Sequence, residues 1–220
     1  MIRVANAPVS YGAFELTVGV RPNVPGPDEV LDAIAAAGYK GTELGSLGYF
    51  GDAGALRERL ESRGLALAGA FVELRFGAGQ DHALLDATLD VLEGLGAKPV
   101  LADAGPRDGD VHWDGVERAA EIARARGLEP TFHHHMGTRV QTPAEIEQLL
   151  ERTSVGLLLD TGHLSAAGGR SAAGAARLAR PNRPPAREGR PPRRASRCGK
   201  LGRGVARRRV LRARHGGRQS

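Results

Sequence analysis

The chain has 220 residues and a formal net charge of +6 at neutral pH, and its length fits a single domain. The single cysteine, Cys198, excludes an intramolecular disulfide and a cysteine-based zinc cluster. No apolar run approaches the roughly 20 residues that a membrane-spanning helix needs, so we expect a cytoplasmic enzyme or binding protein.

The charge is divided between two unlike segments. Residues 170–220 contain 17 of the 31 Arg and Lys and one of the 25 Asp and Glu, a net of +16, and residues 1–169 have a net of −10. All nine Phe, Tyr and Trp residues lie in the first segment. A segment without large apolar side chains cannot bury enough surface to offset the entropy lost on ordering. We therefore expect a folded domain at 1–169 and a disordered tail rich in Arg, Pro and Gly at 170–220.

Residues 1–169 alternate short apolar runs with amphipathic segments, the pattern of βα units on a parallel sheet. Strands are predicted at 2–9, 41–45, 65–74, 99–102, 128–135 and 155–159. Helices are predicted after the first five strands, at about 27–37, 52–63, 81–95, 114–126 and from 143 onward. The sixth strand is almost entirely apolar, which is typical of a strand covered on both faces.

Two helix starts have clear capping patterns. Thr142 is followed by Pro143 and Glu145, which predicts a Thr cap, a proline in the first turn and a reciprocal capping box. Asp114, with Glu117 three residues later, predicts a similar cap for the preceding helix.

The predicted fold class is α/β, an incomplete (β/α)₈ TIM barrel of about six βα units followed by a disordered basic tail. Nothing after Gly169 predicts a seventh or eighth strand. A barrel of this kind closes only with all eight strands, because an open edge leaves backbone groups unpaired.

Polar residues that follow the strands are the candidates for chemistry, because reactive groups of parallel barrels gather at the carboxyl ends of their strands. Alternate residues of a strand share a face, so His133 and His135 should point one way and His134 the other. The remaining candidates are Glu43, Glu73, Asp103, Asp160 and His163. For Glu73 and Asp103, a solvated loop position is the favoured interpretation.

Two imidazoles and a carboxylate from adjacent strands indicate a divalent-metal site, and such mixed ligands suit Mn²⁺, Co²⁺, Zn²⁺ or Fe²⁺. The alternative is that these histidines are hydrogen-bonded core or lid groups. Asp160 has the alternative role of a helix cap, and Glu43 that of a surface carboxylate. The glycines that flank Glu43 argue against the surface role, because glycine permits close approach of a ligand or of backbone.

Two long motifs resemble the inosose (2-keto-myo-inositol) dehydratase family of the xylose isomerase-like sugar phosphate isomerase/epimerase superfamily. They are Phe-His-His-His-Met-Gly-Thr at 132–138, with Val-Gln-Thr at 140–142, and Leu-Asp-Thr-Gly-His at 159–163. Shorter matches are Ala-Pro-Val-Ser-Tyr-Gly at 7–12, Gly-Thr-Glu-Leu-Gly at 41–45 and Gly-Tyr-Phe at 48–50. The resemblance covers residues 1 to about 169.

The resemblance implies a metal-dependent hydro-lyase of inositol catabolism that removes water from a cyclic polyhydroxy ketone. It implies that His133 and Asp160 hold Mn²⁺ or Co²⁺. His135, His163 and Glu43 would be catalytic, with the two histidines as acid–base groups. The implied partner is a small polyol or keto-sugar, with no membrane and no specific nucleic acid, and the full-length family is expected to form homo-oligomers.

The chain departs from the resemblance after Gly169, where later strands should bring another His and a Glu ligand. The Arg, Pro, Gly and Ala that follow are typical of a GC-rich gene read out of frame, so our hypothesis is a frameshift there. We accordingly expect this chain to be inactive as written. Two alternatives are an isomerase or epimerase of the same superfamily and nonspecific nucleic-acid binding through the basic tail.

Overall fold

The computed structural model describes residues 3–77, 80 and 82–169, all within the first of the chain's two units, Met1–Pro185. The tail at 170–220, with its expected disorder and its proposed frameshift origin, lies outside the described residues. Among the described residues, no helix is both long and apolar enough to cross a membrane.

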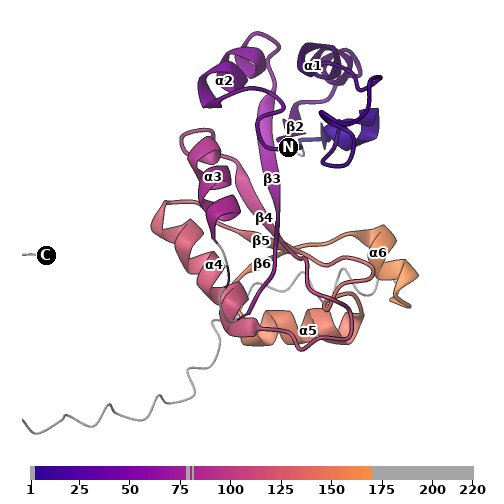
Figure 1. Cartoon of the computed structure of the whole chain (residues 1–220), viewed down its shortest axis with the longest axis vertical. Coiled ribbons are helices and arrows are strands. Elements are labelled where there is room, and N and C mark those ends of the chain that lie inside the picture. Colours follow the sequence, from indigo (N-terminus) through magenta and orange to yellow (C-terminus); the bar gives the residue numbers. More distant parts are fainter. Residues whose placement is uncertain (1–2, 78–79, 81, 170–220) are drawn as a thin grey trace, which may run out of the picture. The chain divides into compact units, whose positions relative to one another are not determined.

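One parallel sheet of six strands organises the described residues, and each strand pairs with its neighbours in sequence, in the order β1-β2-β3-β4-β5-β6 (Figure 1). Its strands are β1 Ala5–Asn6, β2 Gly41–Glu43, β3 Ala66–Leu74, β4 Lys98–Asp103, β5 Thr131–His133 and β6 Gly156–Leu158. The helices are α1 Pro27–Ala36, α2 Ala53–Glu61, α3 Ala83–Leu92, α4 Trp113–Ala125, α5 Pro143–Arg152 and α6 Thr161–Ala166. This order confirms the predicted incomplete TIM barrel of six βα units.

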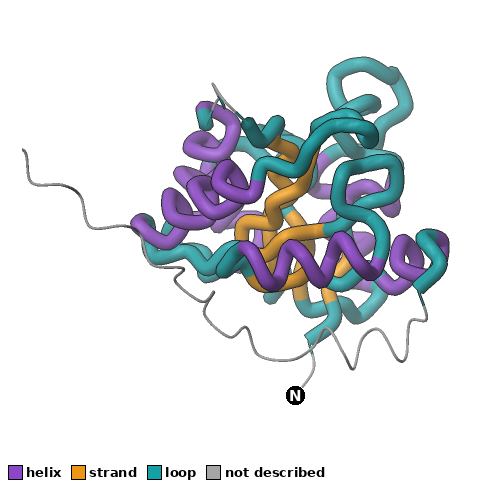
Figure 2. Tube along the Cα trace, turned by 90° about the horizontal axis from the view of Figure 1, so that it is seen from below, coloured by secondary structure: helices purple, strands orange, loops and turns teal. Residues whose placement is uncertain are grey.

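The core lies between the outer face of the sheet and the helices, which surround the strands in Figure 2. Alternate residues of β3, from Ala70 through Val72 to Leu74, are buried on this face. Leu101 of β4 and Phe132 of β5 continue the same face, because they pair in register with Val72 and with each other. Burying these side chains removes apolar surface from water, and this burial is the main source of the fold's stability.

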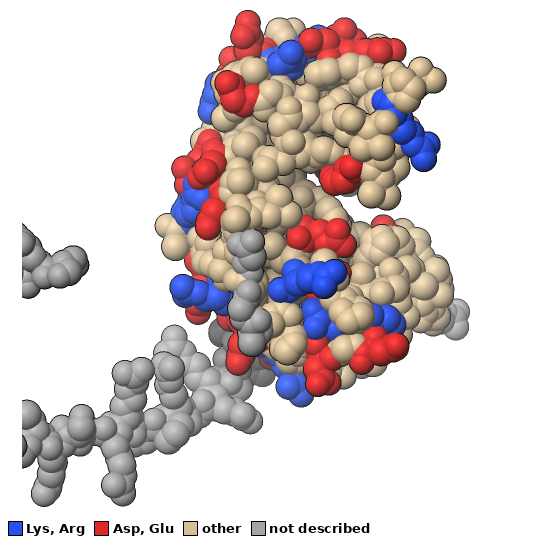
Figure 3. Space-filling view, in the orientation of Figure 1, with Lys and Arg blue, Asp and Glu red and all other residues tan. Residues whose placement is uncertain are grey.

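The inner face of the sheet carries the alternate residues. Phe71 and Glu73 of β3 are exposed there, and Glu73 pairs with Ala102. His133 follows the outer-face residue Phe132 and pairs with Leu158. Figure 3 shows a hollow in the surface on the side of the sheet away from α3 and α4. The inner face is therefore partly open in the described part of the chain.

Strand β6 differs from its predicted environment. The sequence predicts a strand covered on both faces, whereas Gly156, Leu157 and Leu158 are each only half-buried. The physical reason is that β5 is the one strand paired with β6 among the described residues, so its second edge has no partner strand there.

The start of the chain and the end of the sheet also differ from prediction. Strand β1 is confined to Ala5–Asn6, because a 3₁₀ turn at Pro8–Tyr11 follows it. A sixth helix, α6, forms after β6 where none was predicted, and the Asp160 side chain accepts a hydrogen bond from the backbone N–H of His163 at its start.

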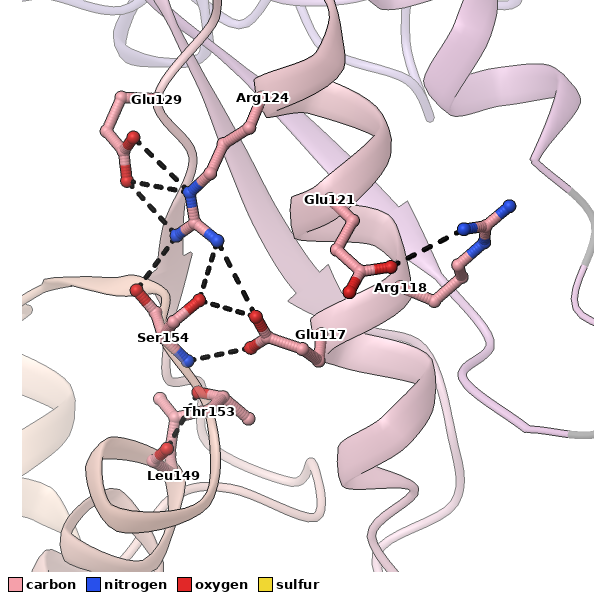
Figure 4. A network of polar contacts seen from close by, with 8 residues as sticks. All are labelled: Glu117, Arg118, Glu121, Arg124, Glu129, Leu149, Thr153 and Ser154. Atoms are coloured by element: carbon pink, nitrogen blue, oxygen red, sulfur yellow. Dashed lines mark hydrogen bonds and ion pairs between the residues drawn. The ribbon is translucent and has the colours of Figure 1, made fainter. Parts of the chain in front are cut away.

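The capping-box prediction is confirmed at α5 and wrong at α4. Thr142 and Glu145 make both reciprocal hydrogen bonds at the start of α5. At α4 the cap residue is His112, with no side-chain cap bond. Glu117 instead accepts hydrogen bonds from Ser154 N (2.7 Å) and Oγ, within the polar network that ties α4 to the start of β6 (Figure 4).

Replacing Thr142 by Ala should lower the free energy of unfolding by about 1 kcal/mol, because the backbone N–H of Glu145 loses the hydroxyl that accepts its hydrogen bond. Urea unfolding followed by circular dichroism measures this difference. Thr142→Ser, which keeps the hydroxyl, is the control. An unfolding midpoint for Thr142→Ala equal to that of the parent would contradict the capping role.

Candidate metal centre

Three histidines converge at the carboxyl ends of β5 and β6. His133, His135 and His163 each offer one ring nitrogen, and these three atoms all lie within 4.8 Å of one another. The ring centroids of His135 and His163 are 4.2 Å apart, and those of His133 and His163 are 5.3 Å apart. The sequence predicted that these residues meet, and the structure brings all three together.

His133 is the most enclosed member of the cluster. Burial, together with the nearby His163 and His135 rings, lowers its pKa from 6.5 to about 4, so the ring is neutral at physiological pH. Its Nδ1 is buried and has no hydrogen-bond partner among the described residues. Phe71 of β3 packs edge-on against it, with ring centroids 5.8 Å apart. His133 therefore has a neutral imidazole with one nitrogen that lacks a hydrogen-bond partner, as expected of a side chain that binds a metal ion.

His135 lies in the loop after β5, and its ring is oriented by its own backbone. Its Nδ1 is 2.7 Å from the carbonyl oxygen of Met136. A carbonyl can only accept, so Nδ1 carries the proton and Nε2 presents a lone pair. Metal-binding histidines commonly donate their second ring N–H to a carbonyl or carboxylate in this way.

His163 is placed in the first turn of α6. Its Nδ1 is 3.4 Å from the carbonyl oxygen of His134 and 3.5 Å from Oδ2 of Asp160. Both neighbours are acceptors, which favours a proton on Nδ1 and a free lone pair on Nε2. These contacts favour the same tautomer for His163 as for His135.

Asp160 is an N-cap, as its alternative interpretation held. Its Oδ1 accepts the 2.7 Å hydrogen bond from His163 N, and its Oδ2 lies beside the His163 ring. Burial would raise the pKa of Asp160, but the hydrogen bond from the His163 backbone N–H and the nearby His163 ring outweigh it, so the pKa is lowered. Asp160 is thus an ionised carboxylate next to the imidazole cluster.

His134 points away from the cluster, as the alternation of side chains predicts. It is fully buried, and its Nε2 accepts a 3.2 Å hydrogen bond from the backbone N–H of Asp160. Burial lowers its pKa. His134 therefore joins β5 to the start of α6, which is the structural role that the sequence left open for these histidines.

Glu43 is on the inner face of the sheet, because it pairs with Gly69, two residues before Phe71. Burial raises its pKa from the ordinary value of 4.5. Strands β3 and β4 separate β2 from β5, so Glu43 stands apart from the histidine cluster. Gly41 permits close approach of backbone, since a Cβ there would lie 2.6 Å from the carbonyl oxygen of Ala66.

Asp103 is not the solvated loop residue that the sequence favoured. It is on the outer face of β4 and forms a buried ion pair with Arg139, whose Nε lies 2.6 Å from its Oδ2. Arg139 was missed because its partner is 36 residues away and no local pattern joins them. Glu73 is exposed, as expected.

The chemistry of the cluster fits a divalent ion. The set provides three imidazole rings, two of them with Nδ1 beside an acceptor and one with a buried nitrogen that has no partner among the described residues. Imidazole nitrogens suit late first-row ions such as Co²⁺ and Zn²⁺ better than they suit Mn²⁺. His133, with His135 and His163, could therefore hold such an ion.

Several known proteins that are similar in sequence are named inosose dehydratase. An inosose dehydratase of Lacticaseibacillus casei is 34% identical over 168 residues, covering 64% of this chain and 56% of the relative. Those of Klebsiella pneumoniae subsp. pneumoniae and Geobacillus kaustophilus are 31% and 30% identical, covering 53% and 60% of the relatives. The chain therefore spans little more than half the length of the curated relatives it matches. No family model matches it.

Solved structures share the fold at low sequence identity. A probable 3-DHS dehydratase of Bacillus anthracis aligns with a TM-score of 0.63 at 11% identity, over 80% of this chain and 69% of that one. A xylose isomerase-like TIM barrel protein of Mycobacterium smegmatis, in complex with magnesium, aligns with a TM-score of 0.55 at 16% identity. The alignment covers 73% of this chain and 65% of that one. In sequence this chain resembles the inosose dehydratases, and its described part has the fold of the xylose isomerase-like TIM barrels.

Proposed function

We propose that this chain carries the catalytic half of a metal-dependent dehydratase that acts on a cyclic polyhydroxy ketone, 2-keto-myo-inositol, in inositol catabolism. The observation that carries the proposal is the sequence similarity to inosose dehydratases, at 31–34% identity over more than 60% of this chain. The open inner face and the imidazole cluster support it, because a polar ketone needs an accessible site with an electrophile.

We propose that His133, His135 and His163 hold the ion. Their ligand atoms converge, whereas one oxygen of Asp160 is committed to the cap of α6. This replaces the sequence-based hypothesis, in which His133 and Asp160 bind the ion and His135 and His163 transfer protons. In the new arrangement the Asp160 carboxylate orients His163. A bound divalent ion would supply polarisation of the ketone and stabilisation of negative charge next to it.

Loss of water from such a ketone requires two proton transfers. A base takes the proton from the carbon beside the carbonyl, a double bond forms, and the hydroxyl on the next carbon leaves after receiving a proton. We propose Glu43 for one of these transfers, because it is half-buried at the end of β2 and burial raises its pKa above the ordinary value. A carboxyl group tuned in this way exchanges protons at physiological pH more readily than an exposed one.

We propose further that the 220-residue chain does not turn over substrate by itself. Strand β6 is half-buried and has one partner strand among the described residues, so the inner face beside the imidazole cluster is incompletely enclosed. Water that enters an open site weakens the electrostatic interactions on which the reaction depends.

Turnover of 2-keto-myo-inositol tests the function directly. The chain is compared with a version restored to the alternative reading frame after Gly169, each with Co²⁺ or Mn²⁺. We expect activity only in the restored version, with a dehydrated ketone as the product. A product of unchanged mass would instead show an isomerase or epimerase, and activity of the 220-residue chain would contradict the inactivity proposal.

Replacing a histidine of the cluster should weaken Co²⁺ binding more than replacing Asp160. His135→Ala and His163→Ala each remove a ligand, and we expect a loss of affinity of roughly 100-fold or more. Asp160→Asn keeps the helix cap and removes only the carboxylate that orients His163, for which a loss of about tenfold is typical. Isothermal titration with Co²⁺ measures both. A larger loss in Asp160→Asn than in His135→Ala would favour the His133 and Asp160 arrangement.

Glu43→Gln should stabilise the fold at pH 7 while removing a catalytic group. The raised pKa means that the folded chain disfavours the ionised carboxylate, so Glu43 lowers stability once the pH rises above its ordinary pKa of 4.5. The thermal midpoint of Glu43→Gln should exceed that of the parent at pH 7, and the difference should shrink towards pH 4. Glu73→Gln, at an exposed inner-face position, is the control. Equal midpoints at pH 7 would contradict the burial argument.

A further inference from the structure

The most completely buried ion pair of the described residues has no place in the proposed chemistry. The side chains of Arg139 and Asp103 are 5% and 1% exposed, whereas each of the other ion pairs includes a side chain that is at least partly exposed. Burying two charges is costly, and pairs of this kind are more often a device for fixing a geometry than a source of stability.

The Arg139 guanidinium joins three segments that follow neighbouring strands. It binds Asp103 through two N–H groups, Nε at 2.6 Å and Nη2 at 2.5 Å. Nη1 donates to the carbonyl oxygen of Asp110 in the loop after β4 (2.6 Å), and Nη2 also donates to that of Phe76 after β3 (3.3 Å). Gly105 makes this possible, because a Cβ at that position would overlap the guanidinium.

Arg139 belongs to the same short loop as His135. The loop is closed by a hydrogen bond from His135 N to the carbonyl oxygen of Val140 (3.2 Å) and by one from Thr138 Oγ1 to the carbonyl oxygen of His135 (2.8 Å). Val140, next to Arg139, is completely buried. The loop is therefore fixed at its Arg139 and Val140 end, and the backbone hydrogen bonds carry that constraint to His135.

We propose that Arg139, held by Asp103, is a positioning residue that sets the place of the His135 imidazole relative to His133 and His163. This inference rests on the proposed metal site for its metal-binding readout. It goes beyond that site by assigning a role to an ion pair on the opposite face of the sheet. His135 is the one exposed member of the cluster, and it lies outside any strand or helix, so it has the greatest need of such an anchor.

A variant pair separates positioning from stability. Arg139→Met alone leaves the Asp103 carboxylate buried without a partner, which costs about 3–5 kcal/mol and can prevent folding. The double variant Asp103→Leu with Arg139→Met removes both charges, and such replacements are often close to neutral for stability. Arg139→Lys keeps the charge but cannot reproduce the forked contacts of a guanidinium. Arg126→Met, which breaks an exposed ion-pair network on α4, is the matched control.

Two measurements test the inference on the full chain. Isothermal titration with Co²⁺ should show affinity about tenfold or more below the parent in the double variant and in Arg139→Lys, and unchanged affinity in Arg126→Met. His135→Ala should also lower the Co²⁺ affinity of the double variant by a smaller factor than it lowers that of the parent, because His135 is already misplaced in the double variant. Nuclear magnetic resonance of the histidine rings without metal should show a changed His135 Nδ1 signal in both Arg139 variants, with the His134 signals preserved.

The outcomes distinguish the inference from the proposed function. Parent-like Co²⁺ affinity and parent-like His135 ring signals in the folded double variant would overturn the positioning role. A parent chain that binds no Co²⁺ would overturn the metal site alone, and the ring signals would then decide whether Arg139 positions His135.

Discussion

The alternation of side chains across a parallel sheet is the constraint on which the rest of this structure depends. Each strand pairs with its sequence neighbours, so the alternation of β3 carries across the sheet: Leu101 pairs with Phe132, and His133, the next residue, pairs with Leu158. The apolar outer face is covered by helices, which leaves the inner face for chemistry. His133 and His134 are adjacent in sequence and separated in function for this reason: one joins the cluster, and the other anchors the start of α6 from the opposite side.

The two faces support one another at the strand ends. His134, on the outer side, bonds to the backbone of Asp160, whose carboxylate caps α6 and lies beside the ring of His163. Arg139 and Asp103, also on the outer side, fix the loop that carries His135. Strand β5 places His133, whereas His163 and His135 lie in segments that buried polar contacts on the other face hold in place.

The sequence predicted the fold class and most elements because their signals are local. The apolar runs, the capping box at Thr142 and the proline and glycine boundaries of α1 each involve only a few consecutive residues. Alternation correctly predicted that His133 and His135 lie together, although β5 ends at His133 and His135 is held by the loop that follows. Helix α6 was missed although Asp160 supplied the signal of an N-cap, and the cap predicted at Asp114 was wrong because Glu117 binds Ser154 across 37 residues. Contacts as distant as that between Asp103 and Arg139 leave no pattern in a single sequence.

The proposed site brings three imidazoles of this chain, those of His133, His135 and His163, onto one divalent ion. X-ray absorption spectroscopy of the Co²⁺-loaded chain counts and identifies the ligands directly. We expect three nitrogen ligands with the outer-shell scattering that is characteristic of imidazole rings. A spectrum with a single imidazole and mainly oxygen ligands would contradict the three-histidine site. It would favour the arrangement in which His133 and Asp160 bind the ion.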